Sequence, residues 1–515
     1  MLRRTYSVIA ALLLSGLCAF AQSGEYGSYS PYSIFGVGNL ADSPSAYVSG
    51  MAGTGIASRN NRYLNTLNPA AVSVRDSLAL MIDFSVYNTN TIFSQTYGGV
   101  TRHSANNTTN IGGFAISFPI WNKLAGYMGL KPYSSVGYTF SIGSSNADAG
   151  AITQTHSGIG SLYNVYGGLS QSFGKRFSVG AEADYIFGKL EKQYVQDLAS
   201  SGYNEAQAKQ TLTLNAFTGK FGAQYEQPIG KDFKLSAGAT YTMRSWLHGF
   251  NNGDYYSAGS VQNVTLPESY ADTLRGASGI ALAGELGLGI TLNYRNKFRA
   301  SFDYSRSDWR NSGMDSAKGF AVSDAQQSFD NSVRESFKLG FEYVPGISDV
   351  RYYYKRIAYR AGAYYNNSYY TVAGRPVNSA GITLGATLPV FRWYNGLSIS
   401  LDIGQRGPFK GDLVRENYFK ICVVLVQLLT GVVAGSLCQQ LQRLHSWTCL
   451  VGLLQYADAG RDNLVCVGIV QLGTTVADTA YLEYSQVVNL HGVTHQGLFT
   501  GTLHEVAQDA FDGAL

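Results

Sequence analysis

The chain holds few groups of residues that could do chemistry, and their spacing argues against a metal or nucleotide site. His504 and Glu505 begin like the zinc-binding helix motif H-E-x-x-H, but Gln508 occupies the place of the second His. The stretches "GVGNLA" and "GTGIAS" resemble dinucleotide-binding loops, yet no strand-helix-strand unit surrounds either of them. We therefore expect no metal, no cofactor and no nucleic-acid partner, and we expect that the protein is not an enzyme.

Charged residues recur at every second position of several strand-like runs. Carboxylates and bases placed in this way could serve acid-base catalysis or ion selection. Charges of both signs inside a barrel more often pair across strands and hold what fills the lumen, and this is the interpretation that we favour. The expected lumen charges are Glu182, Asp184, Lys234, Arg299, Asp303, Lys338, Glu342, Arg360 and Asp402.

The elements that carry these charges alternate with a period of two. In "RFSVGAEADYIFG" (176–188), one face holds Phe177, Val179 and Tyr185, and the other holds Glu182 and Asp184. "FKLSAGATYTMR", "FRASFDYS", "SFKLGFEY" and "LSISLDIG" alternate in the same way. The longest of these runs exceed the five or six residues of an ordinary strand and reach the nine to eleven that cross a bilayer.

Composition and the first residues place these strands in a membrane. Arg3 and Arg4 precede an apolar run and the small-x-small pattern "AFAQ", which predicts a signal peptide over residues 1–21. Residues 22–421 contain no Cys, so disulfides cannot hold the exported region together. Charged residues make up only 14% of the chain, while Tyr (37) and Gly (59) are abundant. Together these features predict an all-β transmembrane barrel in the outer membrane of a Gram-negative bacterium.

The alternation predicts about fourteen antiparallel strands over residues 78–421, with the last strand reaching about 429. Short turns and long polar loops alternate along the chain, as expected when the turns face the periplasm and the loops face outside. We expect long loops near 92–108, 144–156, 192–209, 250–275, 311–332 and 370–379. The expected strands are 78–91, 109–120, 124–142, 157–172, 176–191, 210–227, 232–249, 276–293, 297–310, 333–344, 355–369, 380–391, 396–406 and 413 onward.

Residues 22–77 precede the first strand and are expected to form a hatch that plugs the lumen. They carry too many apolar side chains to remain in water, among them Phe35 and Met51. Near their end stands the motif Asn68-Pro69-Ala70. Pro69 fixes its own φ and disfavours helix at Asn68, so the motif predicts a stiff corner with a short polar side chain that can bond the wall.

With these features, residues 25–421 resemble the outer-membrane long-chain fatty-acid transporter family of the FadL/TodX type. The resemblance implies a fourteen-stranded barrel, an N-terminal hatch and an Asn-Pro-Ala motif that abuts an inward kink of the third strand, where the wall opens sideways. Here the third strand contains "GLKPYSS", so Lys131, Pro132 and Tyr133 are the expected kink. Alternatively, Pro132 only ends one strand and begins another. If Lys131, Pro132 and Tyr133 form the kink, we expect Asn68-Pro69-Ala70 to contact residues 131–134, and we expect replacement of Asn68 with Ala to slow the uptake of hydrophobic substrate.

The function that the resemblance implies is passive transport of hydrophobic small molecules, such as long-chain fatty acids, with lateral release into the membrane. The expected partners are that substrate, outer-membrane lipid and the barrel insertion machinery, and we expect a monomer. An alternative is a related barrel that acts as a shuttle or binding protein for secreted proteins. A porin for polar solutes is a third possibility, although a plugged lumen argues against it.

The chain changes character after Ile421. Residues 422–515 contain no Lys and no Pro, hold four of the five Cys, and carry two Arg against seven acidic residues. "CVVLVQLL" suits the end of the last strand because it is rich in Val. We interpret residues 430–515 as an anomalous tail, frameshifted or chimeric, that is not part of the barrel. A fused domain and a single membrane helix at 421–438 are the alternatives.

Overall fold

The structure is a computed structural model in which the chain divides into two units, Met1–Leu429 and Thr430–Leu515. The residues that it describes are 27–41, 47–74, 80–97, 99–121, 123–146, 150–198, 205–258, 263–265, 270–274, 279–317, 320, 329–391, 395–408, 413–429, 471–474, 480–483 and 499–500. The predicted signal peptide lies outside these residues.

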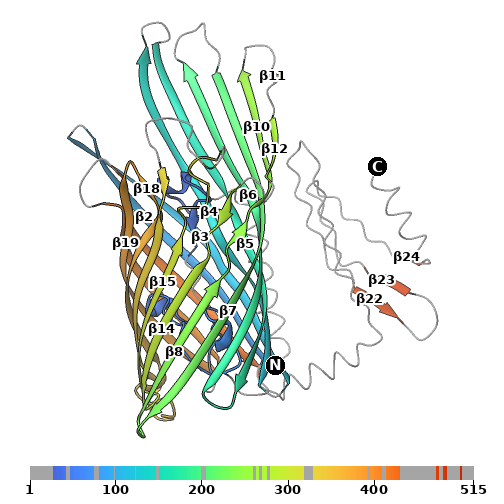
Figure 1. Ribbon diagram of the computed structural model, residues 1–515, viewed down its shortest axis with the longest axis vertical. Helices are drawn as coiled ribbons and strands as arrows, with labels where there is room; N and C mark the ends of the chain where they lie inside the picture. Colours follow the sequence, from blue (N-terminus) through green and yellow to red (C-terminus); the bar gives the residue numbers. More distant parts are fainter. Residues whose placement is uncertain are drawn as a thin grey trace. The chain divides into compact units, whose positions relative to one another are not determined.

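The first unit is a closed antiparallel β-barrel of 14 strands (Figure 1). In chain order the strands are β2 (Leu80–Tyr97), β3 (Val100–Trp121), β4 (Leu124–Asn146), β5 (Gly150–Phe173), β6 (Phe177–Leu198), β7 (Glu205–Ile229), β8 (Phe233–Thr242) with its continuation β10 (His248–Ala258), β14 (Glu285–Tyr294), β15 (Phe298–Asp308), β17 (Val333–Tyr343), β18 (Ala358–Val372), β19 (Arg375–Phe391), β20 (Asn395–Arg406) and β21 (Arg415–Leu429). The barrel closes where β21 pairs with β2, from Leu80 opposite Leu429 to Ser94 opposite Arg415. The predicted fold class is thereby confirmed.

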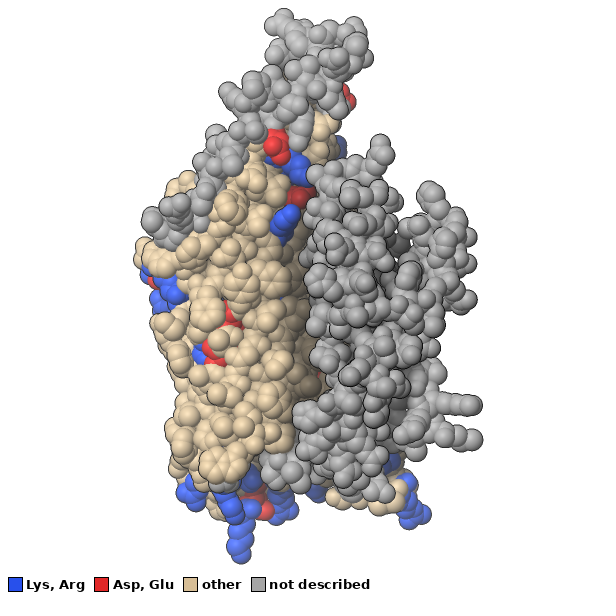
Figure 2. Space-filling view, turned by 90° about the vertical axis from the view of Figure 1, so that its right-hand side faces the viewer, with Lys and Arg blue, Asp and Glu red and all other residues tan. Residues whose placement is uncertain are grey.

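Alternation explains why these sequences close into a barrel in a membrane. On β14, Leu286, Leu288 and Ile290 point outward and are exposed, while Thr291 points inward and is buried. Closure pairs the strands without leaving a first or last edge, which hydrocarbon would not tolerate. On the face that Figure 2 shows, Lys and Arg gather at the lower end and are sparse over the wall above it. The protein is therefore a barrel of the Gram-negative outer membrane.

Several segments expected to be long loops are instead extensions of the strands. β2 runs to Tyr97 and β3 begins at Val100, so most of the predicted loop 92–108 is a hairpin. Likewise β18 ends at Val372 and β19 begins at Arg375, with positive φ at Ala373 and Gly374 in the two-residue turn. The sequence interpretation was wrong here because neither hairpin shows apolar alternation: residues 101–110 are almost all polar, and in β18 the buried apolar residues Tyr369 and Tyr370 are adjacent.

The seventh barrel strand is interrupted between β8 and β10. Around this break β9 (Ser245–Trp246) pairs with β13 (Ala281–Leu282) in a separate two-stranded sheet. Shorter strands add to the barrel wall: β11 (Asn263–Thr265) and β12 (Tyr270–Leu274) pair with β10, and β16 (Phe329–Asn331) pairs with β18. The 3-10 helix η5 (Tyr353–Arg356) precedes β18.

Residues 27–41 and 47–74, here called the inner segment, lie inside the barrel (Figure 1). They form the 3-10 helices η1 (Pro31–Ile34), η2 (Ser49–Met51) and η3 (Pro69–Ala71) and the short strand β1 (Asn39–Leu40). η1 and β1 contact β4, η3 contacts β5 to β7, and η2 contacts β17 to β20. A segment that touches strands all round the wall must occupy the lumen.

Among the described residues, no helix has both the length and the apolar character to span a membrane.

In the second unit the structure describes one small antiparallel sheet. It consists of β22 (Gln471–Thr474), β23 (Ala480–Glu483) and β24 (Phe499–Thr500). The remaining residues of the predicted tail lie outside the described part of the chain, so its interpretation stays a prediction.

Candidate functional site

The pairing of β3 with β4 covers only the lower part of both strands. It runs from Phe114 opposite Leu130 to Trp121 opposite Leu124. Above it, residues 100–113 of β3 pair with β2 alone and residues 131–146 of β4 pair with β5, among the residues that the structure describes. We call this unpaired stretch between β3 and β4 the seam. In Figure 1 the hairpin of β2 and β3 leans away from the tall group of β4 to β7.

Local sequence explains why the ladder ends at this height. The register of β2 and β3 shifts so that Gly112 is an extra residue, and Gly113 has a φ of 149°. On β4, Pro132 lacks an N–H, and the register with β5 shifts between Pro132 and Ser134, which leaves Tyr133 as an extra residue. Bulges bend a strand and increase its twist, so the two strands part where both are bulged.

The inner segment covers the β4 side of the seam. Asn39 and Leu40 pair with Ser135 and Ser134 as an added antiparallel strand. The Ala41 N–H donates to the Tyr133 carbonyl at 2.8 Å. The described part of the inner segment forms no equivalent ladder with β3, so the two edges of the seam differ.

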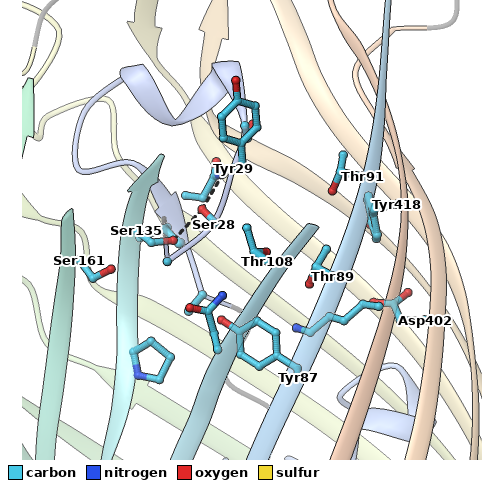
Figure 3. Close-up of a pocket in the computed structure, with 18 of the residues that line it drawn as sticks. Ser28, Tyr29, Tyr87, Thr89, Thr91, Thr108, Ser135, Ser161, Asp402 and Tyr418 are labelled. Atoms are coloured by element: carbon cyan, nitrogen blue, oxygen red, sulfur yellow. Dashed lines mark hydrogen bonds between the residues drawn. The ribbon is translucent and has the colours of Figure 1, made fainter. Parts of the chain in front are cut away.

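A cavity of about 580 Å³ lies behind the seam. Figure 3 shows Ser28 and Tyr29 of the inner segment between Ser135 on β4 and Thr108 on β3. Tyr87, Tyr418 and Asp402 lie on β2, β21 and β20, which follow β3 along the wall. The Ser135 hydroxyl donates to Ser28 Oγ at 2.7 Å. The cavity is therefore bounded by the wall on one side and by the inner segment on the other.

The lining of the cavity is apolar where outward-facing side chains flank the seam and polar on the inward faces of β18, β20 and β21, here called the deep end. At the outer rim stand apolar side chains that are exposed or half-buried: Phe84, Ile111, Phe114, Leu130 and Tyr163. Deeper in the lumen the lining is charged or hydrogen-bonding: Tyr364, Asp402, Arg406, Glu416, Tyr418 and Lys420. This gradient matches a molecule with an apolar body and a polar end.

The deep end of the cavity is already organised by contacts among its own side chains. The Tyr364 hydroxyl donates to Asp402 Oδ1 at 2.9 Å. The Lys420 ammonium lies 4.2 Å from the centroid of the Tyr87 ring. Arg406 donates to Tyr370 at 2.7 Å and lies 3.9 Å from the Glu416 carboxylate. A rigid polar end of this kind can hold a head group in one orientation.

The motif Asn68-Pro69-Ala70 does not lie where it was predicted. Its contacts fall on β5 to β8, and Gly180 of β6 faces the Pro69 carbonyl. Gly180 pairs with Ser170 of β5, which pairs with Ala125 of β4. Residue 125 is six positions below Lys131, so the motif lies closer to the periplasmic turns than the kink does.

Lys131, Pro132 and Tyr133 stand at the lower end of the seam. Pro132 does not end the strand, because β4 continues to Asn146. Lys131 lies 3.8 Å from the Glu182 carboxylate and 4.4 Å from the centroid of the Tyr166 ring. The third strand is therefore bulged at the expected residues, and the inner-segment residues that meet it there are 39–41.

The nine lumen charges lie on the inward face but do not form one cluster. Glu342 pairs with Arg299 at 3.1 Å and with Arg360 at 2.9 Å, and Arg360 lies 4.5 Å from the Tyr47 ring of the inner segment. Other members have separate partners. Tyr127 donates to Glu182, which also lies near Lys131, Asn164 donates to Asp184, and Lys234 pairs with Glu226. Lys338 approaches Gly53, and the Gly55 and Ile56 N–H groups donate to Asp303. Of the nine, Asp402 lines the seam cavity.

The sequence interpretation missed most residues of the cavity. Thr108 lies in the expected loop 92–108, Thr89 and Asn110 lie in the expected strands but were not named as site residues, and Arg406 and Lys420 were not among the expected charges. The signal that could have found them is "SANNTTNIGG" (104–113), a polar run that ends in two glycines beside a membrane strand.

An apolar outer wall, an occupied lumen and a seam with a cavity behind it define an outer-membrane barrel whose wall is interrupted between β3 and β4. The family model described as BamG matches residues 1–428, and the chain belongs to this family. The barrel is similar to that of the Pseudomonas putida toluene transporter TodX, with 14% identity, a TM-score of 0.51, and coverage of 74% of this chain and 97% of that one. It is also similar to the CymD monoaromatic hydrocarbon channel, with 14% identity, a TM-score of 0.50, and coverage of 76% and 98%. The fold expected from the FadL/TodX resemblance is thereby confirmed. A separate comparison with curated proteins finds no match.

Proposed function

We propose that the protein is a passive outer-membrane channel for hydrophobic and amphipathic small molecules, which leave the cavity through the seam into the membrane. The observation that carries this proposal is the interrupted pairing of β3 and β4 with a cavity of about 580 Å³ directly behind it. The fold shared with two hydrocarbon channels supports it.

Lateral release suits an apolar solute for a physical reason. Such a solute gains nothing by entering periplasmic water, whereas each CH₂ group that it buries in hydrocarbon contributes roughly 0.8 kcal/mol. A side opening lets the solute pass from the cavity into the bilayer without full exposure to water. The apolar rim residues Phe114 and Leu130 would be its last contacts in the protein.

The gradient along the cavity favours a long-chain fatty acid as the substrate. A polar head group fits the deep end, where Arg406 and Lys420 stand beside Asp402 and Glu416, and an alkyl chain fits the rim at Phe84 and Phe114. No chemical step is required of the protein, which would act as a monomer surrounded by lipid.

Filling the seam tests the proposal. Thr108 is buried on the inner face of β3 and lines the cavity, so Thr108→Trp should obstruct it. Ile382→Trp places the same ring on the exposed outer face of β19 and serves as the matched control. We expect uptake of radiolabelled oleate by cells to fall by about tenfold or more for Thr108→Trp, corresponding to about 1.4 kcal/mol, and to stay at the wild-type rate for Ile382→Trp. Equal uptake by both variants at equal surface levels would refute lateral passage through the seam.

A further inference from the structure

The two edges of the seam, one on β3 and one on β4, have different neighbours. The β4 edge carries the added strand β1 and a further hydrogen bond at 2.7 Å from the Ser30 N–H to the Gly137 carbonyl. The β3 edge, over residues 100–113, has no strand beside it among the described residues. About every second residue of an edge directs its N–H and C=O groups away from the sheet. A free edge of this length is a template for another strand.

The outer face of the same hairpin carries a ladder of amide side chains. Asn88 donates to Asn107 at 2.9 Å and to Thr109 at 2.8 Å. Asn90 donates to Asn88 at 2.8 Å, and Asn107 also bonds Asn90. These four residues form a continuous polar strip across β2 and β3.

The strip interrupts an otherwise apolar outer wall. Asn88 and Asn90 stand directly opposite Ile421 and Phe419 of β21, which are exposed and apolar. The four side chains bond one another, which lowers the cost of placing them in the wall, but their remaining donors and acceptors can bond only to polar groups and not to lipid chains. The strip is suited to a partner that offers hydrogen bonds.

The inner face of β3 has unsatisfied groups at the same height. Asn106 Oδ1 and Asn110 Nδ2 are buried and make no hydrogen bond. Both residues line the cavity behind the seam. Residues 106–110 therefore offer hydrogen-bonding groups outward, inward and along the edge.

We propose that the free edge of β3 binds an extended strand of another polypeptide, which adds to the barrel sheet along residues 100–110. The strand would carry Asn, Gln, Ser or Thr at alternate positions, because these side chains can continue the amide ladder on one face and bond Asn106 and Asn110 on the other. The inference does not rest on the proposed transport. The docked strand would lie above the rim at Phe114 and Leu130, through which a solute would leave.

Site-specific photo-crosslinking in living cells tests this inference. A photoreactive phenylalanine is placed in turn at Ala105, Asn107 and Thr109, which lie on the outer face of β3, and at Ile382 as the control on β19. Strand addition predicts protein adducts at the three β3 positions, with crosslinked residues in the partner that shift by two for each step of two along β3. The control should give no protein adduct.

A second variant separates docking from folding. Asn107→Leu combined with Thr109→Leu removes the polar strip and should abolish the adduct formed at Ala105 while the barrel stays heat-resistant on gels. Adducts with lipid only, adducts with a second copy of this chain, or crosslinks without the two-residue step would each overturn the inference. Loss of oleate uptake in Thr108→Trp bears on transport and leaves this result unaffected.

Discussion

At the scale of single residues, Asn68 ties together two parts of the inner segment. Its side chain is buried, and its Nδ2 group donates to the Ile56 carbonyl at 2.8 Å. Its Oδ1 atom accepts from the Ala70 N–H at 2.9 Å and so caps η3. Weaker bonds at 3.3 Å reach the carbonyls of Ala223 and Ala239 on the wall. The motif is thus an anchor between the inner segment and the strands β7 and β8.

Replacing Asn68 with Ala should loosen this anchor without closing the seam. The Ile56 carbonyl keeps its bond from Gln224 Nε2 at 2.8 Å, so the cost is that of the lost side-chain bonds, about 0.5–1.5 kcal/mol for each bond. We expect faster hydrogen exchange over residues 55–72, measured by mass spectrometry, and oleate uptake near the wild-type rate, because the motif lies away from the cavity. Asn61→Ala, at an exposed position of the same segment, is the control. A loss of uptake without faster exchange would show that the motif acts in transport directly.

The sequence identified this motif but not its partners. The residue types of Asn68-Pro69-Ala70 predict a polar, stiff corner, and the structure shows one. Which strand faces that corner depends on how the segment folds within the lumen, and one sequence carries no information about contacts between residues 68 and 222. For the same reason the alternation placed Glu342 and Arg360 in the lumen but could not pair them.

At the scale of elements, close approach of the inner segment depends on glycines in the wall strands. A side chain at Gly238 of β8 would overlap the Ile56 carbonyl oxygen. A Cβ atom at Gly180 of β6 would lie 2.5 Å from the Pro69 carbonyl carbon, and one at Gly362 of β18 would lie 2.6 Å from the Ala52 nitrogen. These strands contact the inner segment backbone to backbone, which only glycine permits.

Replacing Gly238 with Val should push the inner segment off the wall. Overpacking of this kind costs about 1–3 kcal/mol, and the segment can yield more easily than the barrel. We expect the barrel to remain heat-resistant while ion conductance in planar bilayers rises above that of the wild type. Gly143→Val adds the same side chain to β4 where no atom lies within 4 Å, and should leave conductance unchanged. Unchanged conductance in Gly238→Val would indicate that the extracellular hairpins close the lumen.

The strands themselves were well predicted where they meet lipid and poorly predicted beyond it. The expected strand 297–310 is observed as Phe298–Asp308, and 333–344 as Val333–Tyr343. Lipid on one face and lumen on the other impose the period of two. Polar residues dominate the β2–β3 hairpin, as in "SANNTTN" (104–110), so the sequence predicted a loop there. The seam between β3 and β4 was visible only as Pro132 and the glycines 112 and 113.

At the scale of the whole molecule, closure of the barrel depends on residues 422–429, which follow the point at Ile421 where the composition of the chain changes. Residues 422–429 pair with residues 80–87 of β2 and complete the closure. Cys422 and Val424 are buried on the inward face. The first unit ends at Leu429, which is also where the family match ends to within one residue.

Two truncations should therefore behave differently. A stop after Leu429 keeps the whole of β21 and should give a barrel as heat-resistant as the full chain. A stop after Ile421 removes the lower half of the closing pair, leaves a free edge in hydrocarbon and should prevent assembly. Limited proteolysis of the full chain should likewise trim it to near residue 430. A protease-resistant fragment of residues 430–515 that unfolds cooperatively would show that the tail is a real domain.

The most direct test of lateral passage is to map where a photoreactive fatty acid contacts the protein in outer-membrane vesicles. A diazirine near the end of the alkyl chain should label peptides that contain Phe84, Thr108, Phe114 and Leu130, and excess oleate should compete for this labelling. A diazirine near the carboxyl group should label the deep end, at Arg406 and Lys420. Labelling spread evenly over the outer wall, or confined to lumen strands away from the seam, would contradict the account.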